Sequence, residues 1–165
     1  MTQTLVYLGL GSNLDQPLKQ LQQALSQLHE HPAMNLVKSS QFYASRPLGP
    51  QDQPDFVNAV AAIQTSLQPL ELLAELKKME AEQGRIKKRH WGERLIDLDI
   101  LYYGDAQVNL PNLQIPHAEI ANRDFVLLPL AEIAPDLVIP NLGKVTDLIT
   151  HLKETFVIPI QGIHE

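Results

Sequence analysis

The feature that most constrains the fold is the order in which apolar segments of strand type and of helix type follow one another. The strand-type segments are Leu5 to Leu10, Asn35 to Ala44, Phe56 to Thr65 and Leu95 to Tyr103. Leucines recur at helical spacing after Pro17, and a second helical stripe begins at Pro69 and ends near Gly84. The chain therefore predicts the order strand, helix, strand, strand, helix, strand.

This order indicates an α+β protein, because a doubly wound parallel sheet requires strict alternation of strand and helix. We expect a ferredoxin-like β-α-β-β-α-β sandwich, with a mainly antiparallel sheet, helices packed on it and C-terminal additions. The predicted additions are a short strand at Gln107 to Leu110 and helices at Phe125 to Ala134 and Val145 to Leu152. No repeat or low-complexity linker divides the sequence, so residues 1–165 are predicted to form a single domain.

Composition excludes several classes of protein and of site. Hydrophobic residues make up 44% and charged residues 19% of the 165 residues, which is too apolar for a disordered chain. The absence of cysteine excludes disulfides, thiolate metal sites and a cysteine nucleophile. No apolar run approaches the ~20 residues of a membrane span, and no basic region precedes the first apolar run. We expect a cytoplasmic protein with no membrane partner.

The distribution of charge is uneven. The chain has 13 basic and 19 acidic residues, a net charge of −6, which argues against a general nucleic-acid binder. Seven basic residues against three acidic ones nevertheless lie between Lys77 and Arg94, a local net charge of +4. Such a cluster suggests a polyanion site, because Lys and Arg make charge-assisted hydrogen bonds to phosphate. A solvated run of charges is the alternative.

Asp97 and Asp99 are the most specific chemical feature. Side chains at i and i+2 of a strand share one face, about 6.5–7 Å apart along the chain. Leu95 and Leu101 lie on the same predicted face, so the two carboxylates are expected to be partly buried and to need a positive partner. Magnesium suits this role, because it accepts one or two carboxylates together with water and substrate phosphates. An exposed acid pair, or one paired with arginines, is the alternative.

The residues before the acid pair favour phosphoryl transfer. The segment from Arg89 to Arg94 contains two arginines and Trp91. Carboxylate-bound metal ions and arginines acting on the same phosphates supply most of the catalysis in such reactions. The chain has no Gly-x-x-x-x-Gly-Lys-Ser/Thr loop, and Gly9-Leu10-Gly11 lacks the third glycine of a dinucleotide fingerprint, so a different kind of ATP site is expected.

An ordered set of motifs extends over nearly the whole chain. It comprises Gly11 to Leu14, Pro47 to Asn58, Glu80 with Gly84-Arg85, Trp91 to Ile100, Pro116-His117 and Asn122, Arg123 and Phe125. With these motifs the sequence resembles the 6-hydroxymethyl-7,8-dihydropterin pyrophosphokinase family of folate biosynthesis. The resemblance implies an ATP-dependent diphosphotransferase that moves pyrophosphate from ATP to the hydroxymethyl group of the pterin and releases AMP. It also implies that the predicted single domain is catalytic.

The resemblance assigns roles residue by residue. Asp97 and Asp99 would be ligands of two Mg²⁺ ions. The catalytic residues would be Arg85, Arg94, Asp97 and Asp99. The ATP site would comprise Glu80, Lys87, Trp91, Arg94, Ile100, His117 and Arg123. The pterin site would comprise Ser45, Leu48, Phe56, Asn58, Trp91 and Phe125, with the pterin ring between the two phenylalanines. A site contained in one chain leads us to expect a monomer that binds ATP and 6-hydroxymethyl-7,8-dihydropterin.

Two other classes of function remain open at this point. An RNA-binding ferredoxin-like module would place exposed aromatic and basic residues on its sheet and would have no need of paired acids. Asp97 and Asp99 count against this, since without metal they would repel a phosphate backbone. A small regulatory domain that binds a nucleotide without chemistry is the third hypothesis.

Overall fold

A computed structural model describes residues 3–12, 16–45, 56–84, 96–117, 120–152 and 157–159. Its main sheet has six strands in the order β10-β3-β4-β1-β5, with β2 also paired to β4. The strands are β1 (Thr4–Ser12), β2 (Met34–Ser39), β3 (Tyr43–Ser45), β4 (Phe56–Thr65), β5 (Asp97–Tyr103) and β10 (Val157–Pro159). All pairings in this sheet are antiparallel. The elements from β1 to β5 thus confirm the ferredoxin-like order, with β1 between β4 and β5.

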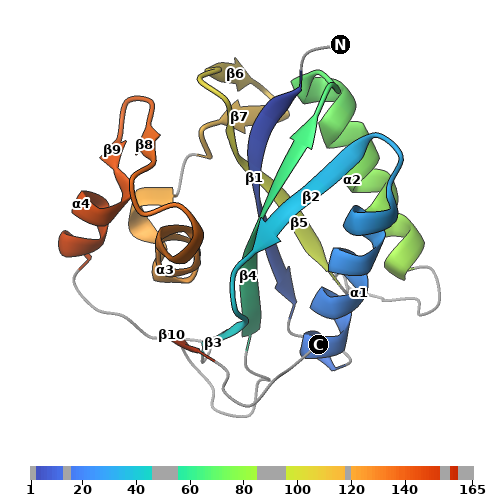
Figure 1. Cartoon of the computed structure of the whole chain (residues 1–165), viewed down its shortest axis with the longest axis horizontal. Helices are drawn as coiled ribbons and strands as arrows, with labels where there is room; N and C mark the ends of the chain where they lie inside the picture. Colours follow the sequence, from blue (N-terminus) through green and yellow to red (C-terminus); the bar gives the residue numbers. More distant parts are fainter. Residues whose placement is uncertain are drawn as a thin grey trace.

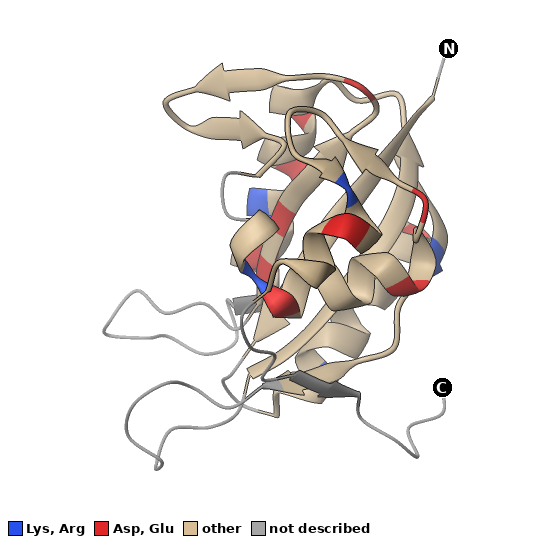
Figure 2. Cartoon of the chain, turned by 90° about the vertical axis from the view of Figure 1, so that its left-hand side faces the viewer, with Lys and Arg blue, Asp and Glu red and all other residues tan. Residues whose placement is uncertain are grey.

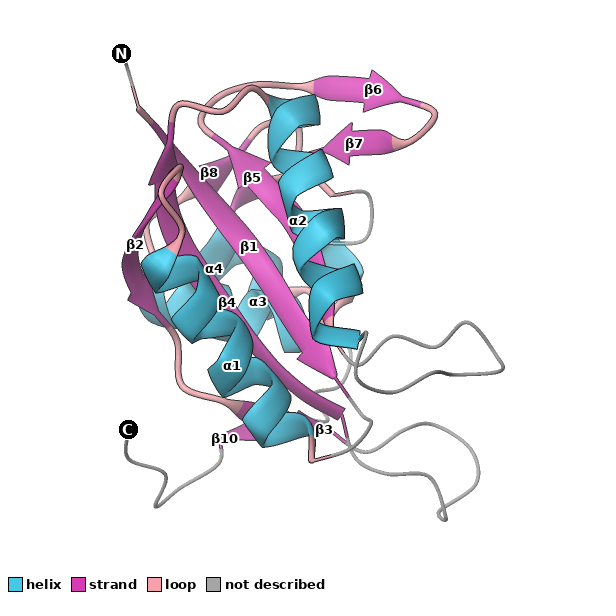
Figure 3. Ribbon diagram, turned by 90° about the vertical axis from the view of Figure 1, so that its right-hand side faces the viewer, coloured by secondary structure: helices cyan, strands magenta, loops and turns pink. Residues whose placement is uncertain are grey.

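Helices α1 (Pro17–Glu30) and α2 (Pro69–Gly84) cover one face of the sheet (Figure 3). The leucine stripe of α1 is confirmed, since Leu21 and Leu28 are completely buried. On α2 the sequence predicts an apolar stripe of Leu70, Leu73, Leu76 and Met79; Leu76 and Met79 are buried as predicted, but Leu70 is 49% exposed and the buried Leu72 was not predicted. The side of α2 that packs on the sheet is therefore turned away from Leu70.

The opposite face carries the C-terminal helices α3 (Asp124–Ile133) and α4 (Val145–Thr150), so the sheet lies between two helical layers (Figure 1). Residues of β4 alternate between the two cores: Val57, Ala59, Ala61 and Ile63 face α1 and α2, and Val60 and Ala62 face the other side. The sequence predicts this alternation by strand periodicity, and the structure confirms it. No helix in the described ranges is both long and apolar enough to cross a membrane.

Several short elements were not predicted or have different limits. The expected strand at Gln107 to Leu110 is the first half of a hairpin, β6 (Val108–Leu110) with β7 (Leu113–Ile115). A second hairpin, β8 (Val138–Ile139) with β9 (Gly143–Lys144), precedes α4. A 3₁₀ turn at Ile120–Asn122 precedes α3. Elements of two or three residues are too short to produce a recognisable periodicity.

The segment Asn35 to Ala44, expected to be one strand, is divided into β2 and β3. Ser40 lies between them, where its hydroxyl accepts a hydrogen bond from the Val60 N–H (3.0 Å) and its own N–H donates to the Val60 carbonyl (2.8 Å). The next N–H, that of Gln41, leaves the ladder and donates to both carboxylate oxygens of Glu132 on α3, at 3.1 and 3.0 Å. Side-chain acceptors therefore replace the strand pairing here.

The hydroxyl of Tyr43 also donates to Glu132, at 2.6 Å. Burial, followed by the hydrogen bond and the charge of Glu132, raises the pKa of Tyr43 well above its usual value. A raised tyrosine pKa means that the unfolded state loses its proton first as pH rises, so the stability from this group is present below pH ~10 and is lost above it.

We therefore expect Tyr43→Phe to lower the free energy of unfolding by about 1–2 kcal/mol at pH 8, since a hydrogen bond to a charged acceptor is lost. The difference in the free energy of unfolding between Tyr43→Phe and wild type should narrow by about 1.4 kcal/mol between pH 9 and pH 11, because only the wild-type unfolded chain ionises at position 43. Urea unfolding at several pH values measures both. A difference that stays constant with pH would contradict the assignment.

Candidate functional site

The candidate site lies on the sheet face that carries α3 and α4, seen from that side in Figure 2. In the sheet register Gly11 of β1 is opposite Asn58 of β4 on one side and Asp97 of β5 on the other. Residues directly opposite one another in a sheet point to the same face. Asn58 and Asp97 therefore flank the bare backbone of Gly11, about 9.5–10 Å apart at two strand spacings.

The predicted acid pair shares this face. Asp99 is opposite Gly9, one pair further along β1, and Leu101 of the same strand belongs to the core formed with α3 and α4. Leu98 and Ile100 are buried in the other core, which confirms the predicted alternation of β5. Asp97 is half-buried and Asp99 exposed, so the carboxylates are more accessible than the sequence indicated. They lie where the helical covering of this face ends.

Asn58 has an incomplete set of hydrogen bonds. Its side chain is 9% exposed, and its Oδ1 is buried with no hydrogen-bond partner among the described residues. A buried acceptor without a partner costs about 1–3 kcal/mol, and a bound water, ion or ligand is one way to satisfy it. Gln83 Oε1 is unpaired in the same way. The role of Asn58 in binding stays a prediction.

Two aromatic side chains accompany Asn58. Phe56, two residues earlier on β4, points to the same face and is 38% exposed. Phe125, in the first turn of α3, is half-buried against the core of this face. Flat aromatic faces suit a bicyclic heteroaromatic ring. The assignment of both residues to a pterin site stays a prediction.

Arg123 and His117 are two of the predicted ATP-site residues that the structure describes. The Arg123 guanidinium carbon lies 5.6 Å from the centroid of the Phe125 ring, a cation–π distance. The main-chain N–H of His117 donates to the Leu101 carbonyl of β5 at 3.2 Å. The main chain of His117 thus lies beside β5, the strand that carries the acid pair, and the cation–π pair is local to the start of α3.

Glu80 and Ile100, predicted at the adenosine end, lie at the outer edge of β5. Glu80 is 4% exposed, and its Oε2 accepts a hydrogen bond from the Leu98 N–H at 2.7 Å. This N–H belongs to the residue between the two aspartates, so Glu80 holds the strand that presents them. Ile100 is 4% exposed with its side chain in the opposite core. By strand periodicity its main-chain N–H and C=O point to the same edge as the Leu98 N–H.

The remaining predicted residues lie wholly or partly outside what the structure describes. The backbone of Ser45 pairs with Phe56 at the end of β3, which places it beside the aromatic part of the site. Leu48, Arg85, Lys87, Trp91 and Arg94 are outside the described residues. Their assigned roles stay predictions.

Gly11 belongs to one of the motifs of the resemblance, but the sequence assigned it no role in the site, because Gly9-Leu10-Gly11 after a strand predicts a tight turn with close backbone packing. Both glycines instead lie within β1, paired on both sides. Glycine inside a strand often marks close approach of another group. The glycines were visible in the sequence, but the group that approaches Gly11, the side chain of Asn58, could be identified only from the register of β1 and β4.

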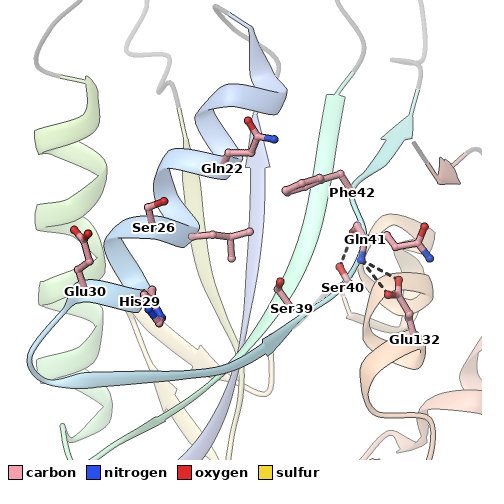
Figure 4. A pocket seen from close by; sticks show the side chains of 10 residues that line it. Gln22, Ser26, His29, Glu30, Ser39, Ser40, Gln41, Phe42 and Glu132 are labelled. Carbon is pink, nitrogen blue, oxygen red and sulfur yellow. Dashed lines mark hydrogen bonds between the residues drawn. The ribbon is translucent and has the colours of Figure 1, made fainter. Parts of the chain in front are cut away.

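A separate hollow of about 470 Å³ lies between α1 and the junction of β2 and β3 (Figure 4). Leu25 and Phe42 form its apolar part, and Gln22 and Ser26 of α1 and Glu132 of α3 contribute polar groups. The Glu132 carboxylate accepts the two bonds from the Gln41 N–H described above. Among the residues that the structure describes, those predicted for the ATP, pterin and metal sites do not line this hollow.

Comparison with known proteins agrees with the geometry. The family model described as 7,8-dihydro-6-hydroxymethylpterin-pyrophosphokinase (HPPK) matches residues 7–135. The chain is 52% identical over 148 residues to 2-amino-4-hydroxy-6-hydroxymethyldihydropteridine pyrophosphokinase of Haemophilus influenzae, covering 90% of this chain and 92% of that protein. It is 49% identical over 144 residues to the protein of the same name from Pseudomonas aeruginosa, covering 87% and 89%.

Solved structures agree at the level of the fold. The Plasmodium falciparum HPPK-DHPS wild type with pteroate superposes with a TM-score of 0.73 at 16% identity, covering 90% of this chain and 42% of that one. The chain thus spans less than half of that solved protein. Because the family model covers most of the chain and the two bacterial relatives match along nearly their full length, the chain belongs to the HPPK family and is a pyrophosphokinase of folate biosynthesis.

Proposed function

We propose that this enzyme transfers pyrophosphate from ATP to the hydroxymethyl group of 6-hydroxymethyl-7,8-dihydropterin in a magnesium-dependent reaction. The observation that carries the proposal is the row Asn58–Gly11–Asp97, which joins a recognition amide and a carboxylate across three neighbouring strands. The pterin ring and the hydroxymethyl group that accepts pyrophosphate would thus be bound on one continuous surface.

The acid pair suits Mg²⁺ better than a softer metal. The donors are two carboxylates on one strand face, and the described residues contain no group of three or more His, Cys, Asp or Glu arranged to hold a metal. Magnesium commonly takes one or two carboxylates and completes its octahedron with water and substrate phosphates, so two acids suffice. When bound at Asp97 and Asp99, two Mg²⁺ ions would neutralise phosphate charge and acidify a coordinated hydroxyl.

The pterin would be held by contacts that the structure leaves available. The buried Oδ1 of Asn58 is an acceptor, and the amino and ring N–H groups of a pterin are donors. Phe56 and Phe125 offer apolar ring faces for stacking. An analogue without these N–H groups should be rejected, because the Asn58 acceptor would stay unpaired.

The nucleotide would lie toward the edge of β5. The main-chain groups of Ile100 point to this edge and can hydrogen-bond an adenine, while Arg123 can neutralise phosphate charge. In the transfer, the hydroxymethyl oxygen bonds to the β-phosphorus and its proton leaves to solvent. The bond from the β-phosphorus to the oxygen of the α-phosphate breaks, and AMP leaves with its electron pair. We expect the enzyme to act as a monomer, because the proposed residues need no second chain to complete the site.

One assay tests the proposal. The purified protein is incubated with ATP, magnesium chloride and 6-hydroxymethyl-7,8-dihydropterin, and products are identified by mass spectrometry. We expect AMP and the pterin diphosphate in equal amounts, dependent on both substrates and abolished by EDTA. Formation of ADP, or AMP formation independent of pterin, would contradict the proposed transfer.

Arg94 and Arg85 supply a second test, which rests on their assigned roles. We expect Arg94→Ala and Arg85→Ala to reduce kcat by about 10²-fold with a smaller change in the KM for pterin, because an arginine can bind the transferring group more strongly in the transition state. Arg94→Lys and Arg85→Lys should restore little of the lost kcat, because lysine lacks the planar guanidinium that can hydrogen-bond two phosphate oxygens at once. Steady-state kinetics of the four variants measures this, and an effect confined to KM would contradict the role.

A further inference from the structure

The space above Gly11 is occupied by the side chain of Asn58. A Cβ placed on Gly11 would lie 2.8 Å from Asn58 Nδ2, closer than real Cβ atoms approach other groups. The next nearest atoms, Asn58 Cγ and the Val57 carbonyl oxygen, would be 3.9 and 4.0 Å away, at ordinary contact distance. The collision is therefore with one atom, the amide nitrogen of Asn58.

The backbone of Gly11 gives no reason for glycine. The described glycines with positive φ are Gly104 and Gly143, and Gly11 is an ordinary paired residue of β1. Glycine within a strand weakens it, because it has no side chain to pack and loses more conformational freedom on folding. The absence of a side chain at position 11 is thus best explained by the Asn58 amide that fills the space.

We propose that Gly11 is a positioning residue for pterin recognition, acting through Asn58. Without a Cβ at position 11 the Asn58 carboxamide lies over β1, on the side facing Asp97, and its buried Oδ1 has no hydrogen-bond partner among the described residues. A methyl group there would displace the amide and misplace this acceptor. The inference rests on the proposed function, because it takes the pterin as the molecule that Asn58 recognises.

The location of the collision determines which property should change. The obstructing atom is the end of a side chain, which can swing away at little cost, whereas an obstructing backbone would prevent folding. Gly11→Ala should therefore fold and lose pterin affinity. We expect the pterin Kd and KM to rise roughly tenfold or more, as for the loss of a well-placed hydrogen bond, with the KM for ATP within about twofold of wild type.

Gly9 provides a matched control on the same strand and face. Its Cβ would lie 3.4 Å from Leu101 Cδ2, an ordinary contact with a flexible apolar side chain of the buried core. Gly9→Ala introduces the same methyl group and the same change in strand propensity without touching Asn58. We expect its pterin KM to stay within about twofold of wild type, with any cost appearing in thermal stability.

A double-mutant cycle separates action through Asn58 from a direct effect of the methyl group. Pterin binding is measured by calorimetry, with a non-hydrolysable ATP analogue and magnesium, for wild type, Gly11→Ala, Asn58→Ala and the double variant. If Gly11 acts through Asn58, the double variant binds pterin as Asn58→Ala does. A further loss in the double variant as large as that of Gly11→Ala alone would overturn the proposal, as would wild-type affinity in Gly11→Ala.

The NMR signal of the Asn58 amide and the folding of the double variant give two further tests of the role of Gly11. The side-chain amide signal of Asn58, assigned in ¹H–¹⁵N spectra by its absence in Asn58→Ala, should shift in ligand-free Gly11→Ala and stay in place in Gly9→Ala. If Gly11→Ala does not fold, the double variant, which has no amide to collide with, should fold as Asn58→Ala does, and its failure would overturn the proposal. A wild type that does not bind pterin would refute the proposed function, whereas an unshifted amide would refute the role of Gly11.

Discussion

Replacement of either acid of the pair should nearly abolish turnover: Asp97→Asn and Asp99→Asn are each expected to lower kcat by about 10³-fold or more. Each substitution keeps the volume of the side chain and removes one negative charge at the place where phosphate charge must be neutralised. Because Asp99 is exposed and Asp97 half-buried, neither change should unfold the protein. Quenched-flow or steady-state assays with saturating ATP and magnesium measure the loss.

Asp105→Asn is the matched control for these variants. Asp105 is an exposed acid in the turn that follows β5. Asp105→Asn therefore removes the same charge close to the end of the same strand, at a residue outside the proposed site. We expect its turnover to stay within about twofold of wild type. Circular dichroism and thermal unfolding of all three variants establish that they are folded. Near-normal turnover of Asp97→Asn or Asp99→Asn at saturating magnesium would exclude the proposed metal ligands.

Glu80→Ala should produce the largest loss of stability, about 2–4 kcal/mol in the free energy of unfolding. The change leaves the buried Leu98 N–H without its acceptor and creates a cavity between α2 and β5. Glu80→Gln retains an acceptor oxygen and the volume, and should cost about 1 kcal/mol. Because Leu98 lies between Asp97 and Asp99, Glu80→Ala should also raise the magnesium concentration needed for half-maximal turnover.

Lys77 provides the control for the charge of Glu80. Its Nζ lies 3.7 Å from Glu80 Oε1, but its side chain is 55% exposed, and an ion pair with an exposed partner contributes little. Lys77→Ala should therefore change the free energy of unfolding by no more than about 0.5 kcal/mol. Urea unfolding of the three variants gives the comparison. If Glu80→Ala were as stable as Lys77→Ala, the hydrogen bond to Leu98 would have no part in holding β5.

The strands and helices that could be predicted are those long enough to repeat a period. β4 and β5 alternate between two cores, so their faces could be assigned before any partner was known, and the acid pair was correctly placed on one face. The division between β2 and β3 could not be foreseen, because it depends on Glu132 accepting the Gln41 N–H from a helix far along the chain. Periodicity carries no information about such contacts.

The sequence by itself determined the order of elements, the shared face of Asp97 and Asp99 and, through its motifs, the family. These follow from local spacing, because neighbouring residues on a strand have fixed relative directions. Only the tertiary structure decided that Gly11 lies between Asn58 and Asp97, and that the Glu80 carboxylate binds the edge of β5. Register between strands distant in sequence is set by how both sheet faces pack against their helices, and this depends on the whole chain at once.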